Sequence, residues 1–329
     1  MINLYGPNVL DTNEKIKNKI SSNLEDINKQ SSNYIKDIVM LINKEIGVNK
    51  ILSIILFGSQ RLNQENTIIS DCDLLFIFKN RVSNRHIKEI EKYFIALEIK
   101  HNFREPNSSL IHDILGVIQQ STGMFVSHFL TKQKFWEHGV FHKIFQVNRV
   151  FSAMFAPRNI VLGNVIENST ILYGEDLRFL LKPNIKITIF EMFRSTIMNL
   201  FISFFALLIG PFRKLKSIKY QLEALKWTLR SSNYYCFGDS ELLNKIIERF
   251  VAFEKGEKQP KARKYFSQFL KLRTAPYNDL GFMIRNPIRI MKIHVKAIIY
   301  KKMVKRKKLK LPLKQKEPIV PPRTFPIQF

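Results

Sequence analysis

The sequence predicts an α+β protein with a mixed sheet in its first half, a mostly α-helical domain after it, and a basic C-terminal tail. Three short apolar runs, at residues 52–57, 70–78 and 124–131, have the length and composition of buried strands. Segments with apolar residues at helical spacing lie between these runs and make up most of the chain beyond residue 186. Residues 280–316 carry 13 Lys and Arg and no Asp or Glu, which sets this tail apart.

Length and pattern together divide the chain into four parts. We expect a helical segment that packs on the core at residues 1–48, an α/β domain at 49–178, a helical domain at 179–280, and a basic amphipathic helix with a Pro-rich tail at 281–329. The 329 residues are 45% hydrophobic and include 27 Phe, so the chain can bury a sizeable core.

The overall composition limits the kinds of binding partner and the cellular compartment that we expect for this protein. The net charge of +26 favours a polyanionic partner, which leaves nucleic acid, anionic lipid and nucleotides open, although lysines that merely coat the surface would give the same total. Cys72 and Cys236 are far apart and have no companion ligands, which argues against a disulfide framework or a zinc site. The first residues lack a basic segment followed by an apolar one, so we expect no signal peptide and a cytoplasmic protein.

Helices are predicted between and before the strands. A helix covers residues 12–47, either continuous or broken once, and Ser83 opens another that runs to residue 99. A further helix is predicted at residues 110–119. Residues 159–165 and 169–173 are predicted to be two short extended pieces.

The stretch that carries chemistry is residues 51–78, which predicts a strand, a glycine turn, a polar segment and a second strand. The second strand opens with Ser-Asp-Cys-Asp. Side chains alternate along a strand, so Asp71 and Asp73 point to one face and Cys72 points to the other, toward the core. Two carboxylates this close repel each other unless a cation lies between them, and Mg²⁺ is commonly held by one or two carboxylates plus substrate phosphates. An ordinary hairpin with an acidic edge is the alternative interpretation.

Gly58 and Ser59 follow the first strand of this stretch. Glycine lets the backbone approach a ligand closely, and a hydroxyl beside it can donate to a phosphate oxygen. If residues 60–64 form a short helix, its first N–H groups would face the same anion. A phosphate binder and a metal binder at the ends of neighbouring strands are the equipment for phosphoryl or nucleotidyl transfer.

This arrangement resembles the DNA polymerase β-type nucleotidyltransferase superfamily, over fewer than thirty residues. Residues 171–177 and 220–229 are similar, more loosely, to segments of small-molecule nucleotidyltransferases such as the aminoglycoside adenylyltransferases. The resemblance implies that Gly58 and Ser59 hold the triphosphate of an NTP, expected to be ATP, and that Asp71 and Asp73 bind Mg²⁺ or Mn²⁺. It further implies transfer of a nucleoside monophosphate to a small molecule, a protein side chain or an RNA end, with a helical domain closing over the catalytic sheet.

The sequence departs from that superfamily at one position. A third acid normally lies on a later strand, but the predicted strand at residues 124–131 has Ser127 and His128 roughly at that place. Asp113 is a candidate by residue type, in a segment that is equally consistent with a helix. A third acid from elsewhere, help from His128, and weakened metal binding all stay open. In the last case the protein would be a catalytically silent binding or regulatory protein of the same fold.

The helical half contains one segment with two interpretations. Residues 195–212 are uncharged, which approaches the length of a membrane span. Gly210 and Pro211 end the helix early, and Asn199 and Ser203 place polar groups on one of its faces, so a buried core helix is favoured over a membrane segment. Residues 215–231 predict the next helix, with Lys219 and Lys226. The resemblance implies that one of them reaches the triphosphate, and a solvated lysine face is the alternative.

The basic tail is predicted to begin as an amphipathic helix. Its basic face consists of Arg285, Arg289, Lys292 and Lys296. The adjacent face is apolar and consists of Ile284, Ile288, Met291, Val295 and Ile298. Such a helix is typical of a contact with nucleic acid or with an anionic membrane surface, here through residues 281–316. The second partner would make the protein peripheral at a membrane, and a solvated basic tail is the remaining alternative.

Overall fold

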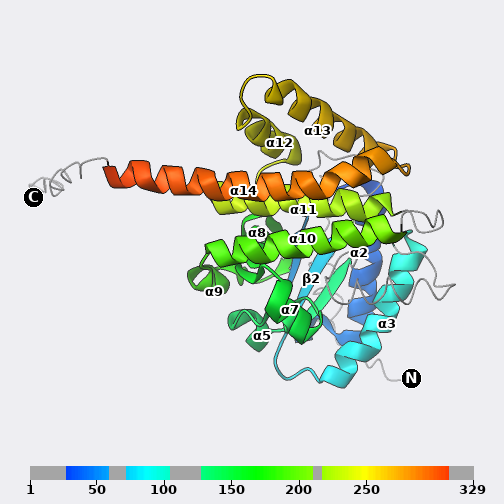
Figure 1. Cartoon of the computed structure of the whole chain (residues 1–329). Coiled ribbons are helices and arrows are strands. Elements are labelled where there is room, and N and C mark those ends of the chain that lie inside the picture. Colours follow the sequence, from blue (N-terminus) through cyan, green and yellow to red (C-terminus); the bar gives the residue numbers. More distant parts are fainter. Residues whose placement is uncertain (1–26, 59–71, 104–126, 210–216, 311–329) are drawn as a thin grey trace, which may run out of the picture.

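The computed structural model describes residues 27–58, 72–103, 127–209 and 217–310. Within them the chain forms a four-stranded mixed sheet with helices on both faces, followed by a mostly helical region (Figure 1). The predicted α+β class is therefore confirmed. Three of the predicted site residues, Ser59, Asp71 and Asp113, lie outside the described residues, as do the predicted helix at 110–119 and the start of the predicted strand at 124–131.

The sheet has the strand order β3-β2-β1-β4. Its strands are β1 (Ile51–Phe57), β2 (Asp73–Phe78), β3 (His128–Lys132) and β4 (Ser169–Gly174). β1 pairs antiparallel with β2 and β4, and β2 pairs parallel with β3. Phe57 lies opposite both Asp73 and Ser169 in this register. The end of β1 and the beginnings of the other three strands therefore meet at one edge of the sheet.

One face of the sheet is covered by α2 (Lys29–Leu41) and α3 (Asn84–Lys100). The side chains of Asn28 and Ser83 accept hydrogen bonds from the first turns of these helices, which is the usual way a helix N-terminus is satisfied. Their apolar faces pack on alternate strand residues, namely Tyr34, Ile38, Ile90 and Phe94 against Leu74, Phe76 and Phe78. Short helical turns at Ile42–Ile46 and Val48–Lys50 lead from α2 into β1.

The opposite face is covered by short helices from the middle of the chain. They are α5 (Gln133–Glu137), α6 (Phe141–Ile144), α7 (Arg149–Phe155), α8 (Arg158–Glu167) and α9 (Arg178–Leu181), with a 3₁₀ turn at Lys182–Asn184. Leu75 and Ile77 of β2 pack there with Trp136, Ile144 and Leu162. The prediction of extended structure at residues 159–165 is wrong, because they lie in α8. The extended piece at 169–173 is confirmed as β4.

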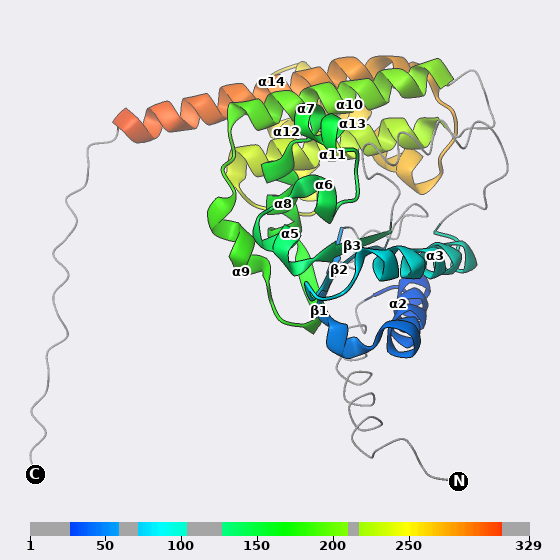
Figure 2. The ribbon, with the colours of Figure 1, turned by 90° about the horizontal axis from the view of Figure 1, so that it is seen from below.

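Three long helices form the centre of the helical region: α10 (Ile189–Ile209), α11 (Ile218–Phe237) and α14 (Leu280–Lys310). α12 (Leu243–Ala252) and α13 (Lys258–Thr274) pack beside them. α10 and α14 lie side by side on an outer face, on the far side of the molecule from α2, and the C-terminal part of α14 extends beyond the other helices (Figures 1 and 2). Because α14 contributes Phe282, Ile290 and Ile293 to the core, it is an integral helix of this region.

The inner face of α10 is polar where it meets α11. Ser203 Oγ donates to Gln221 Oε1 at 2.5 Å, Ser195 Oγ donates to Ser231 Oγ at 2.8 Å, and Asn199 Nδ2 donates to Ser195 Oγ at 3.2 Å. The predicted polar stripe thus serves helix packing. Within the described residues, one segment, Ile189–Leu208, has the length and apolar composition needed to cross a membrane. In its most apolar part, 44% of the segment is buried inside the protein.

Candidate active site

The candidate site begins where β1 ends, at Gly58. Its φ angle is +83°, a conformation that residues with a Cβ rarely adopt. A Cβ placed on Gly58 would lie 2.1 Å from Oδ2 of Asp73. This contact follows from the register, since Asp73 is paired with Phe57, the residue before Gly58. Both the backbone angle and the neighbouring carboxylate therefore favour glycine at this position, since a Cβ would strain the backbone and force Asp73 to move.

Strand alternation decides on which side of the sheet Asp73 lies. Leu75 and Ile77, at the following alternate positions, belong to the core under α5, α6 and α8, and Phe57 opposite Asp73 belongs to the same core. Cys72 is fully buried with Leu74 and Phe76 in the core on the other face. The prediction that Cys72 faces the core behind the acidic position is confirmed.

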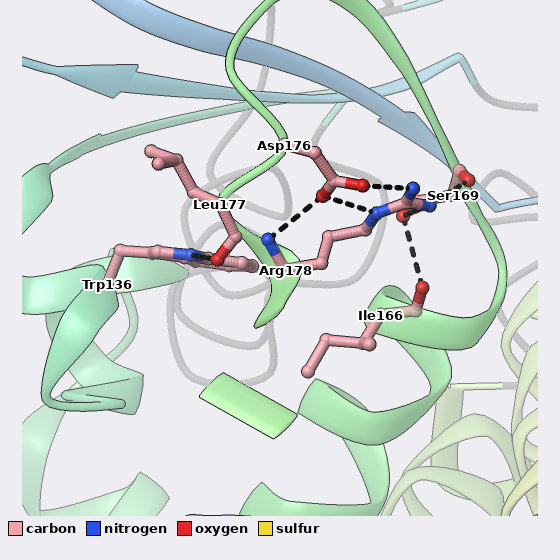
Figure 3. A network of polar contacts seen from close by, with 6 residues as sticks. All are labelled: Trp136, Ile166, Ser169, Asp176, Leu177 and Arg178. Atoms are coloured by element: carbon pink, nitrogen blue, oxygen red, sulfur yellow. Dashed lines mark hydrogen bonds and ion pairs between the residues drawn. The ribbon is translucent and has the colours of Figure 1, made fainter. Parts of the chain in front are cut away.

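The beginning of β4 is held firmly beside Gly58. Asn168 Nδ2 donates to the carbonyl oxygen of Gly58 at 3.4 Å. Arg178 donates from Nη1 to the carbonyl oxygen of Ser169 at 2.8 Å, and from Nη2 and Nε to the carboxylate of Asp176 at 2.6 and 2.8 Å (Figure 3). These bonds fix the strand that flanks the glycine turn.

The same network keeps Asp176 charged and anchors it to the helices below the sheet. The hydrogen bond from the Arg178 side chain lowers the pKa of Asp176, outweighing the opposite effect of partial burial. Buried Trp136 donates from Nε1 to the carbonyl oxygen of Leu177 at 2.8 Å (Figure 3). Neither Trp136 nor Arg178 was singled out from the sequence as a site residue, and only the wider 171–177 similarity pointed to this region.

The two residues proposed for the third acidic position fall on different faces. Leu74 and His128 are register partners, so His128 lies on the α3 side with Leu74, whereas Ser127 aligns with Asp73. The ring of His128 packs on Phe94, and its Nδ1 lies 2.8 Å from Oε1 of Glu98. The strand register therefore directs the side chain of His128 away from the face on which Asp73 lies.

Glu98 is the residue of this region that the sequence interpretation missed. Its carboxylate is buried and also accepts from the backbone N–H of Ser127 at 3.0 Å. It lies four residues after Phe94, on the otherwise apolar face of α3. A carboxylate on the buried face of an amphipathic helix requires a partner, and that was the available signal. Glu98 ties α3 to the beginning of β3.

Lys219 and Lys226 lie seven residues apart on α11, and thus on similar faces of it. Lys226 forms an ion pair with buried Glu223, which also accepts from Arg273 Nη1 at 3.3 Å. Burial alone would raise the pKa of Glu223, but Lys226 and Arg273 lower it. A phosphate group that bound Lys226 would therefore compete with Glu223. Lys219, in the first turn of α11, is half-buried.

Asp71 and Asp73 are the residues of the candidate site that could hold a divalent metal ion. Among the residues that the structure describes, no three His, Cys, Asp or Glu side chains lie close enough to hold a metal ion. Asp73 lies at the edge where the strands meet, and Asp71 precedes it outside the described residues. Carboxylate oxygens are the ligands that Mg²⁺ and Mn²⁺ prefer, so the chemistry of this pair fits such an ion.

Comparison with solved structures gives a likeness in fold. No protein-family model matches the sequence, and no curated protein matches it. The chain is similar to the crystal structure of spectinomycin adenyltransferase AAD(9) from Enterococcus faecialis, determined with ATP and spectinomycin. The two share 10% sequence identity, with a TM-score of 0.45, over 81% of this chain and 98% of that one.

Proposed function

We propose that this protein is a metal-dependent nucleotidyltransferase, which moves a nucleoside monophosphate from an NTP to an acceptor. The observation that carries the proposal is the contact between Gly58 and Asp73. A left-handed glycine at the end of one strand lies against a carboxylate at the beginning of its neighbour. This contact supports the proposal because a phosphate can approach a glycine backbone closely, and a carboxylate is an oxygen ligand that Mg²⁺ and Mn²⁺ accept.

The residues of the chain divide into two roles. Asp71 and Asp73 would hold Mg²⁺ or Mn²⁺, and the backbone of Gly58 with the hydroxyl of Ser59 would hold the β- and γ-phosphates of the NTP, with ATP as the expected nucleotide. A divalent ion bound there would neutralise charge on the phosphates and lower the pKa of the acceptor hydroxyl. Lys219 and Lys226 are further candidates for binding the triphosphate. Lys226 could do so only by giving up its ion pair with Glu223.

The reaction is a displacement at the α-phosphorus. The acceptor oxygen forms a bond to it, the bond between the α-phosphorus and the bridging oxygen breaks, and pyrophosphate leaves with the electron pair of that bond, while the acceptor hydroxyl gives its proton to solvent water. The contribution of the chain is to position the phosphates and to offset their charge. The acceptor is a small molecule, a protein side chain or an RNA end, and the net charge of +26 favours an anionic one.

A radiolabelled transfer assay tests the proposal. The protein is incubated with each α-³²P NTP, Mg²⁺ or Mn²⁺, and a cell lysate as the pool of acceptors. We expect label in an acceptor with the wild type and none with Asp73→Asn. Glu89→Gln is the matched control, because it removes an exposed carboxylate on α3 and should transfer label normally. Equal label with wild type and Asp73→Asn would refute the assigned site.

A catalytically silent protein of the same fold is the second candidate. It is favoured by Ser127, which aligns with Asp73 where an acid would be expected and carries no charge. Such a protein would bind an NTP with metal but transfer no label, and would act through residues 281–316 on nucleic acid or an anionic membrane. NTP binding without transfer, over all four nucleotides and both metals, would favour it.

A further inference from the structure

α10 and α14 together expose a large apolar surface. The contributing side chains are each about half exposed or more: Phe190, Phe193, Phe201, Phe204 and Leu208 of α10, and Leu280, Ile284, Ile288, Met291, Val295 and Ile299 of α14. The two helices pack side by side on an outer face of the molecule (Figures 1 and 2), and these exposed residues are together called here the α10/α14 face. Contiguous apolar surfaces of this kind on soluble proteins mark sites of interaction.

These side chains are exposed because each of the two helices packs on the core through only one of its faces. α14 is apolar on two faces, and only the face with Phe282, Ile290 and Ile293 packs in the core. The apolar face predicted from the sequence, which includes Ile288 and Val295, lies largely outside the core. α10 likewise buries its polar stripe and leaves four of its five phenylalanines exposed, while Phe205 packs on the core. Both helices therefore present apolar side chains that the described part of the fold leaves exposed.

A row of basic residues borders this face along α14. Arg285, Arg289, Lys292 and Lys296 each follow an exposed apolar residue by one position, which places them about 100° farther around the helix. Arg289 and Lys296 share one acid, Glu254, and Lys292 is exposed. Neither α13 nor α14 contains an Asp or Glu. The border is therefore net positive over the length of both helices.

The charge rises further toward the C-terminal part of α14. Residues 301–310 include seven Lys and Arg, and this part of the helix extends beyond the other helices (Figures 1 and 2). Clusters of four to eight basic residues beside an amphipathic helix are typical of contacts with anionic lipid headgroups.

We propose that the α10/α14 face binds an anionic lipid surface. The phenylalanine, isoleucine and methionine side chains enter the boundary between headgroups and acyl chains, and the basic border binds the headgroups. The two helices lie in the plane of the membrane. α10 does not cross it, because its inner face stays bonded to α11 through Ser203–Gln221 and Ser195–Ser231.

Charge complementarity favours lipid over a second copy of the chain. A two-fold symmetric dimer through this face would bring two copies of the same net-positive surface together, whichever way the two-fold axis runs. Like charges brought together at an interface cost free energy, whereas anionic headgroups complement them. Nucleic acid would match the charge, and its bases can stack on phenylalanines, but it would leave the exposed leucine, isoleucine, valine and methionine side chains of this face in water.

Vesicle flotation with the full-length protein tests the proposal. Vesicles of phosphatidylcholine with a quarter phosphatidylglycerol are compared with phosphatidylcholine alone, at low and high salt. We expect binding to the anionic vesicles that weakens with salt. Phe204→Asp/Ile288→Asp, with one change on each helix, should reduce binding at least about tenfold, and Lys292→Glu/Lys302→Glu should reduce it mainly at low salt.

The matched control is Tyr93→Asp/Phe179→Asp, which charges two equally exposed large side chains away from the α10/α14 face. It should bind as the wild type does. Circular dichroism and thermal unfolding confirm that each variant is folded. The proposal is overturned if the wild type does not float, or if Phe204→Asp/Ile288→Asp floats as well as the control. It is also overturned if the wild type is a dimer that ignores vesicles and becomes a monomer on the Phe204→Asp/Ile288→Asp change.

Discussion

The glycine at position 58 is favoured for two reasons, its own backbone angle and the position of the Asp73 side chain. The positive φ of Gly58 disfavours any residue with a Cβ, and the carboxylate of Asp73 occupies the space that a Cβ would need. The sequence predicted the glycine turn and the acid separately. It could not reveal their contact, because that depends on the strand register, in which Phe57 rather than another residue pairs with Asp73.

Gly58→Ala is predicted to destabilise the protein by about 1–3 kcal/mol through backbone strain, with a further loss because Asp73 must move. Nucleotide binding should fall with it. Gly238→Ala is the matched control. Gly238 has a φ of +73°, but no neighbouring atom lies within 4 Å of the position that a Cβ would take, so this substitution introduces backbone strain without a steric clash. Chemical denaturation of both variants gives the comparison. A smaller loss of stability for Gly58→Ala than for Gly238→Ala would contradict this description of the turn.

At the scale of elements, α8 shows why part of the fold escaped prediction. Residues 159–165 are rich in β-branched and apolar side chains and were predicted to be extended. In the structure they form a helix between the sheet core and α11, and Gly163 lies so close to the Tyr234 ring that a Cβ would clash with it. Contacts with α11 outweighed local propensity, and no pattern within the segment revealed them. The strands β1, β2 and β4, whose apolar runs are short and bounded, were predicted well.

Three helices of the helical region also meet around one buried histidine. Nδ1 of His294 on α14 lies 2.9 Å from the carbonyl oxygen of Ile290, and Nε2 lies 3.1 Å from Ser195 Oγ on α10. Ser195 in turn bonds Ser231 of α11. Burial lowers the pKa of His294 to about 4, opposed only in part by the hydrogen bond to Ile290. The ring is therefore neutral in the folded protein near neutral pH.

This predicts a pH dependence of stability with a definite sign. The unfolded chain binds a proton at His294 below about pH 6.5, while the folded chain does so only below about pH 4. The free energy of unfolding should therefore fall as the pH is lowered from about 6.5 to about 4, by about 3 kcal/mol at most from this group. Denaturation of wild type and His294→Gln over this range measures the effect. The variant should lose the part of the slope that His294 contributes, whereas His138→Gln, which lies outside the helical region, should keep the slope of the wild type.

At the scale of the whole molecule, the sequence predicted the order of a mixed sheet and a helical region, and it located Gly58 and Asp73. It could not say which face of an apolar helix would be buried. α14 has two apolar faces, and the core takes Ile290 and Ile293 and leaves Ile288 and Val295 outside. That choice depends on how α10, α11 and α14 pack together, which no local pattern contains. The predicted roles of Gly58 and Asp73 in binding phosphate and metal stay predictions, and so do those of Ser59, Asp71 and Asp113, which lie outside the described ranges.

The central claim is that Asp73 and Gly58 form a metal-dependent nucleotide site, and ATP binding tests it without knowledge of the acceptor. Calorimetric titration of ATP is made with Mn²⁺ and with a chelator, for wild type, Asp73→Asn and Glu89→Gln. We predict that wild type and Glu89→Gln bind ATP only with the metal, and that Asp73→Asn loses this binding while remaining folded. ATP binding of equal affinity in wild type and Asp73→Asn, with or without Mn²⁺, would contradict the claim.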